Sequence, residues 1–135
     1  MGGVAWLTLG QVTEIHSRNV DRYGGARGIR DAGLLDSALD RPRNKWAYGE
    51  RDILALAAAY AFGLARNHPF VDGNKRTAFI AMAVFLGANS RALTAPNDDA
   101  TATMLALATG TLSEEALAAW LAGVTEPRPG SSEVG

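Results

Sequence analysis

The stretch HPFVDGNKR, residues 68–76, lies between the two most hydrophobic segments of the chain. ILALAAAYAFGLA (53–65) precedes it and TAFIAMAVFLGA (77–88) follows it. Each segment is long enough for a helix and is apolar on nearly all faces, as expected of helices buried at the centre of a domain. The sequence therefore predicts two central antiparallel helices, over about 52–67 and 74–88, joined by a polar loop.

The chain before these helices also carries helix signals. Thr8 with Gln11 is typical of a capping box, and the helix that it begins is expected to end at YGG (23–25). Asp31 is expected to cap a short helix that Pro42 stops. We therefore expect helices on the N-terminal side of the central pair.

The remaining segments predict a helical fold with little β structure. RPRNKWAYGE (41–50) has no clear period and is interpreted as an ordered excursion or short hairpin. Two C-terminal helices are expected, one after TAPND (94–98), capped by Asn97 or Asp98, and one after a second capping box, Thr111 with Glu114. The prediction is an all-α bundle with at most a minor β-hairpin.

Composition bounds the domain count. We expect a single domain over 1–124, and the tail TEPRPGSSEVG (125–135) has the composition of a disordered end. Hydrophobic residues make up 47% and charged residues 20% of the 135 residues, as in ordinary globular proteins.

Charge and residue usage exclude several classes of protein. A net charge of −1 gives no basis for broad binding to nucleic acid or to anionic membranes. The chain has no cysteine and only two histidines, His16 and His68, which excludes thiol chemistry and multi-histidine metal sites. Neither apolar run reaches the ~20 residues that span a bilayer. We therefore expect a soluble, cytoplasmic protein.

The polar loop has the side chains of an anion and metal site. A helix that starts near Asn74 directs unpaired N–H groups into the loop, and Gly73 lets a ligand approach the backbone closely. Lys75 and Arg76 oppose the helix dipole in its first turn, which a bound phosphate would offset. Asp72 beside such a phosphate is suited to Mg²⁺.

His68 completes this set as a candidate general base, because its ordinary pKa of ~6.5 suits proton transfer near neutral pH. Taken singly, each residue also has a structural explanation: Asp-Gly-Asn is a common turn, and a histidine at a helix end often bonds a carbonyl. Their combination in nine positions favours a phosphoryl- or nucleotidyl-transfer site. Neither a Walker loop nor GxGxxG occurs.

HPFVDGNKR resembles the signature of the Fic superfamily, HPFx[D/E]GN followed by Gly or Lys and then Arg. The run HPFVDGNKRTA (68–78) resembles the Doc (death-on-curing) branch, whose members are toxins of toxin–antitoxin pairs. DRYGGARGIRDAGLLDSALDRP (21–42) and ATGTLSEEALAAWL (108–121) are similar to the corresponding Doc segments. The resemblance thus extends over about residues 8–122.

This resemblance implies a compact all-α Fic/Doc fold and a set of roles. His68 would take the proton from a serine or threonine hydroxyl of a protein target, and Asp72 would bind Mg²⁺ on ATP. The ATP phosphates would lie in a cradle formed by Gly73, Asn74, Lys75 and Arg76. Doc-like members are protein kinases of elongation factor Tu that stop translation, whereas typical Fic enzymes transfer AMP.

Two positions bear on the choice between these reactions. Position 75 is lysine where AMP-transferring members usually have glycine, and position 79 is phenylalanine where they commonly have arginine. Lys75 is expected to fill the space for the α- and β-phosphates, which favours transfer of the γ-phosphate. HPFVDGN itself matches the AMP-transferring pattern, so AMP transfer remains the alternative, together with a catalytically silent module that binds an antitoxin.

The resemblance also implies a partner. The self-inhibiting [S/T]xxxE[G/N] motif of some Fic proteins is matched only by Thr111 and Glu115, with Ala116 in place of Gly or Asn. Restraint is therefore expected from a Phd-like antitoxin, a DNA-binding protein whose disordered tail folds as a helix on this chain. Residues 41–50 are interpreted as the flap that aligns the target in this superfamily.

Overall fold

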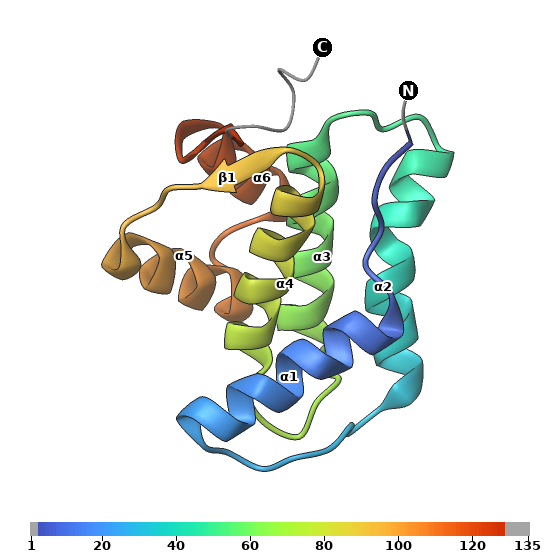
Figure 1. The fold of residues 1–135 in the computed structure, drawn as a ribbon, viewed down its shortest axis with the longest axis vertical. Helices are drawn as coiled ribbons and strands as arrows, with labels where there is room; N and C mark the ends of the chain where they lie inside the picture. Colours follow the sequence, from blue (N-terminus) through green and yellow to red (C-terminus); the bar gives the residue numbers. More distant parts are fainter. Residues whose placement is uncertain (1–2, 129–135) are drawn as a thin grey trace.

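The computed structural model describes residues 3–128 and confirms the all-α prediction (Figure 1). Within that part of the chain there are six helices and one small antiparallel sheet. In chain order the elements are α1 (Leu9–Tyr23), α2 (Ala32–Ala47), α3 (Ile53–Asn67), α4 (Asn74–Ala88), β1 (Arg91–Leu93), α5 (Asn97–Thr109), α6 (Glu114–Gly123) and β2 (Thr125–Pro127).

Helix α3 forms the centre of the bundle, with α2, α4 and α6 packed around it (Figure 1). Its side chains are apolar on every face, and residues 56–61 are all fully buried. Helix α4 returns beside α3 after a short loop, and α1 crosses the end of the pair where that loop lies (Figure 1). The predicted central helices are thus confirmed, at 53–67 and 74–88.

Small residues set how closely α2 approaches α3. A Cβ atom added to Gly63 would lie 3.0 Å from both Cα and Cβ of Ala38. The obstructing atoms include backbone, which cannot move aside without shifting α2. Gly63 therefore allows a close contact that any larger side chain disturbs.

Replacing Gly63 with alanine is expected to destabilise the fold by about 1–3 kcal/mol, because overpacking outweighs the better helix propensity of alanine. Urea unfolding followed by circular dichroism measures this as a lower midpoint. Gly123→Ala in α6 is the matched control, since a Cβ there meets no atom within 4 Å. Equal midpoints for Gly63→Ala and the unchanged protein would contradict the close contact.

Tyr60 of α3 anchors the segment before α1. Its ring is fully buried, and its hydroxyl accepts a hydrogen bond of 3.0 Å from the Leu7 backbone N–H. Burial raises the pKa of the Tyr60 phenol above its ordinary value of 10.0, although the Leu7 bond and the charge of Arg43 act in the opposite direction. The phenol therefore stays neutral in the folded state beyond the pH at which it ionises in the unfolded chain.

This raised pKa predicts an alkaline loss of stability. Above about pH 10 the unfolded chain releases the Tyr60 proton before the folded chain does, so the unfolding free energy falls as pH rises. Tyr60→Phe should weaken this decline, at a cost of about 1–3 kcal/mol at neutral pH because the Leu7 N–H loses its acceptor. Chemical unfolding of both proteins between pH 8 and pH 11 measures the two effects. Parallel curves would contradict the assignment.

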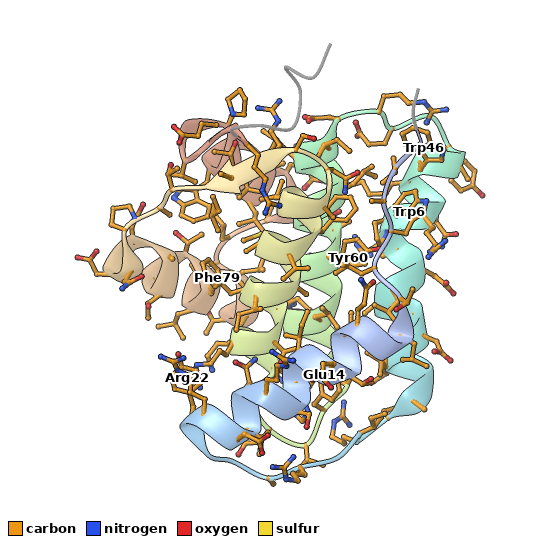
Figure 2. All side chains as sticks on the ribbon, in the orientation of Figure 1. Trp6, Glu14, Arg22, Trp46, Tyr60 and Phe79 are labelled. Atoms are coloured by element: carbon orange, nitrogen blue, oxygen red, sulfur yellow. The ribbon has the colours of Figure 1, made fainter. Side chains whose placement is uncertain are left out.

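The structure corrects the prediction for 41–50. Helix α2 continues through Pro42 to Ala47, so these residues form neither a hairpin nor a flap. Pro42 is buried, and Trp46 beyond it packs edge-on against Trp6 with ring centroids 6.1 Å apart (Figure 2). Burial of this face against the core thus outweighs the hydrogen bond that proline removes from the helix.

The C-terminal predictions need three further corrections. Ser113, not Thr111, caps α6, and Pro96 stands at the N-cap of α5 without a side-chain bond. Thr125–Pro127 form β2 and pair with β1, because this short strand covers the edge that β1 exposes. The predicted tail therefore begins too early. Its residues from 129 onward lie outside those described.

Glu114 joins α6 to α2 and takes no part in capping, because Ser113 caps α6. Its carboxylate is buried and accepts hydrogen bonds from Arg41 (Nε at 2.9 Å) and Lys45 (Nζ at 2.7 Å), which join α6 to α2. All three residues line a cleft of about 720 Å³ between α2, α3 and α6. Glu115, the acidic residue of the weak match to the self-inhibiting motif, lines the same cleft.

Candidate functional site

The loop between α3 and α4 has a backbone fixed at both ends. His68 ends α3 in the left-handed conformation (φ 49°, ψ 55°), and Gly73 begins α4 in the same region (φ 75°, ψ 20°). Left-handed backbone is uncommon for residues other than glycine and costs about 1–3 kcal/mol when the surroundings impose it. The loop is therefore held in shape by its contacts.

Asn74 provides the first of these contacts. Its side chain is buried, its Oδ1 accepts from the Phe70 N–H, and its Nδ2 donates to the Phe70 carbonyl, both at 2.9 Å. The amide thus closes the loop on itself. Asn74 does not cap the helix, because Gly73 is the N-cap and no side chain bonds it.

The segment 24–31 provides the second set of contacts. It lies along the loop, with an antiparallel bridge between Ile29 and Phe70. The Val71 N–H donates to the Gly28 carbonyl at 3.0 Å, and the Arg30 N–H donates to the Pro69 carbonyl at 2.7 Å. The glycine-rich segment 24–31 is therefore one wall of the candidate site.

His68 is exposed, and its backbone is held from this wall. The Arg30 side chain donates to the His68 carbonyl (Nε, 2.7 Å) and to the Asn67 carbonyl (Nη2, 2.9 Å). The cation thereby satisfies carbonyl groups at the C-terminus of α3. Arg30 was not singled out from the sequence, where a lone arginine in a glycine-rich loop gives little signal.

Asp72 is exposed at the other end of the loop. Its Oδ1 accepts from the Gly73 N–H at 3.1 Å and its Oδ2 accepts from the Ala26 N–H at 3.3 Å. A Cβ added to Gly25 would lie 3.0 Å from Oδ2, and Gly25 has a φ of 114°. Segment 24–31 therefore also sets the position of the carboxylate.

The start of α4 is electropositive. Its first turn contains no acidic residue, and Gly73 leaves its N–H groups without a side-chain acceptor. Lys75 and Arg76 are both exposed, and neither forms an ion pair with another residue of the described chain. The Arg76 guanidinium lies over the Tyr23 ring, 4.0 Å from its centroid. Such a helix start favours an anion.

The sequence-predicted side chains thus belong to one loop and the first turn of one helix. His68 and Asp72 are exposed at its two ends, Lys75 and Arg76 are exposed on α4, and Gly73 lies between them. Asn74 alone is turned inward. The loop and the first turn of α4 thus carry an imidazole, a carboxylate and an electropositive helix start within nine residues.

A magnesium ion fits this donor set only together with a phosphate ligand. In residues 3–128 no group of three or more acidic, histidine or cysteine side chains is placed to hold a metal. Asp72 is one exposed carboxylate next to an anion-attracting helix start. Mg²⁺ bound by nucleotides uses one or two carboxylates in addition to phosphate oxygens and water, which matches what Asp72 offers.

Comparison with known proteins identifies the family of the chain. The sequence model of the Fic/DOC family matches residues 6–86, which include segment 24–31 and the whole loop. The chain belongs to the Fic/DOC family.

No described helix is long and apolar enough to cross a membrane.

Two relatives carry the name Doc. The chain is 43% identical over 106 residues to "Toxin Doc" of Mycolicibacterium smegmatis (strain ATCC 700084 / mc(2)155), covering 75% of this chain and 81% of that protein. It is 36% identical over 80 residues to "Protein kinase doc" of Escherichia phage P1, covering 58% of this chain. That second match spans 64% of the phage protein, less than two thirds of its length.

Proposed function

We propose that this chain is a Doc-type toxin of a toxin–antitoxin pair and transfers the γ-phosphate of ATP to a serine or threonine hydroxyl of a protein. The observation that carries the proposal is the placement of His68, Asp72 and the electropositive start of α4 on one braced loop. Membership of the Fic/DOC family and the names of the two relatives support it.

In this mechanism His68 is the general base. An imidazole nitrogen accepts the proton of the target hydroxyl while the oxygen of that hydroxyl attacks the γ-phosphorus. The bond between that phosphorus and the bridging oxygen breaks, and ADP leaves with the electron pair. The exposed position of His68 suits a base that must reach a residue on another protein.

The start of α4 would hold the phosphates. Its free N–H groups and the side chains of Lys75 and Arg76 supply positive charge where the transferred group gains negative charge. Asp72 would hold Mg²⁺ on the phosphates, and the ion, when bound, supplies further charge neutralisation. Asn74 contributes by keeping the Phe70 turn closed, so its role in the cradle is to shape it.

Two side chains favour γ-phosphate transfer over AMP transfer. Lys75 is exposed and has no ion-pair partner in the described chain, so its ammonium group is available at the helix start. Phe79 packs against the hydrophobic core on the side of α4 that faces α5 (Figure 2) and cannot bind phosphate. AMP transfer stays the second candidate because HPFVDGN fits both reactions.

The resemblance to Doc proteins supplies the proposed partners. Elongation factor Tu is the target that it implies, which places the action in the cytoplasm, and a Phd-like antitoxin is the inhibitor. Segment 24–31, rather than 41–50, lies beside the loop and presents exposed Ile29 next to exposed Val71. We therefore assign the role of aligning the target backbone to segment 24–31 and not to residues 41–50.

Induced expression in a bacterial host tests the toxin assignment. We expect growth to stop soon after induction and to resume when a Phd-like antitoxin is expressed as well. The host's elongation factor Tu should carry phosphate, which phosphate-affinity gel electrophoresis detects. Normal growth with unmodified elongation factor Tu, at a confirmed level of folded protein, would contradict the proposal.

A further inference from the structure

His16 of α1 lies beneath the candidate site and is the second of the two histidines in the chain. Its side chain is buried, with 5% of the residue exposed. The imidazole ring stacks on Phe70, with centroids 3.9 Å apart and ring planes inclined by 7°. A Cβ added to Gly73 would lie 3.9 Å from the same ring. The imidazole thus supports both halves of the loop.

His16 also makes a directional bond to the loop. Its Nε2 lies 2.8 Å from the backbone carbonyl oxygen of Asp72. A carbonyl oxygen can only accept, so Nε2 carries the hydrogen and donates it. This bond fixes the peptide unit that follows the Asp72 side chain, and it is independent of the Ala26 contact on the carboxylate itself.

We infer that His16 is a positioning residue that sets the direction of the Asp72 carboxylate and thereby the affinity of the site for magnesium-bound ATP. This inference rests on the proposed function of Asp72. Outer groups that orient a metal ligand typically change metal affinity by about 10–100-fold when they are removed. A buried residue with a purely structural role would change stability alone.

Three variants separate these two roles. His16→Phe keeps an aromatic ring against Phe70 and removes the hydrogen-bond donor. His16→Gln removes the ring but supplies a side-chain N–H donor. Asn19→Ala is the matched control, because Asn19 is buried one turn further along α1 and its side chain donates to Thr77 inside α4 at 3.3 Å. All three alter the buried face that α1 turns toward α4.

Isothermal titration calorimetry with ATP, in the presence of Mg²⁺ and in the presence of EDTA, measures the contribution of the metal. We expect His16→Phe to reduce the gain in affinity from Mg²⁺ about tenfold. His16→Gln should recover most of it, and Asn19→Ala should leave it unchanged. Without any ligand, amide hydrogen exchange in residues 70–76 should be faster in His16→Phe than in Asn19→Ala.

Each other result overturns a specific statement. If His16→Phe keeps the full Mg²⁺-dependent gain and normal exchange in 70–76, His16 is only a core residue and the proposed function stands. An equal loss in His16→Phe and Asn19→Ala would also reject a positioning role. If the unchanged protein binds ATP no better with Mg²⁺ than with EDTA, the role of Asp72 in the proposed function fails, and the inference fails with it.

Discussion

Replacing His68 with asparagine should reduce transfer of phosphate to the target protein by about 10²–10⁴-fold, the usual contribution of a general base. Asparagine adopts the left-handed backbone conformation more readily than most residues, so the φ of 49° at this position can be kept. The variant should therefore lose the base and retain the loop. The rate with labelled ATP and the purified target measures the change.

The same variant separates an enzyme from a binding module. Its thermal unfolding and its affinity for a Phd-like antitoxin should match those of the unchanged protein, because His68 is exposed and only its backbone carbonyl takes part in bracing. Growth arrest should disappear on expression. Full toxicity of a stable His68→Asn protein would show that His68 is not the base.

Replacing Asp72 with asparagine should have the second large effect, a loss of about 10–100-fold in the affinity gained from Mg²⁺. Asparagine has the same shape and keeps an oxygen that can accept from Gly73, but it lacks the charge that a hard cation prefers. Titration of the variant with ATP, with and without Mg²⁺, measures the loss. Affinity in EDTA should be unchanged or higher, because a negative charge near the phosphates has been removed.

Asp36→Asn serves as the control for removing one carboxylate, because Asp36 is an exposed residue of α2 outside the candidate site. It should retain the full Mg²⁺ effect. If Asp72→Asn retains that effect as well, Asp72 does not hold the metal, and the electropositive start of α4 would act alone on the phosphates.

The sequence was sufficient for the helical core. Unbroken apolar runs around 68–76 specify buried helices, and side-chain caps at Thr8 and Asp31 place two helix starts as predicted. The path of α2 could not be predicted, because Pro42 is a local breaker and the packing of Trp46 that outweighs it is a long-range contact. Strand β2 was missed for the same reason, since its partner β1 lies more than thirty residues earlier.

The candidate site shows the same division. The residues proposed to contact a ligand were visible because their types are unusual between two apolar helices. The residues that brace them were not, because His16 and Arg30 act on backbone carbonyls far along the chain. The buried bonds of Asn74 to Phe70 were not visible either, because an asparagine at a helix start has the same sequence whether its side chain is exposed or closes a loop.

The central claim is tested most directly by incubating the purified protein with Mg²⁺ and elongation factor Tu, using ATP labelled at the α-phosphate or at the γ-phosphate. The proposal predicts that only the γ-label enters elongation factor Tu and that His68→Asn prevents its entry. Entry of the α-label would show an AMP transferase and would contradict the argument from Lys75 and Phe79. Entry of neither label would contradict a transferase acting on this target.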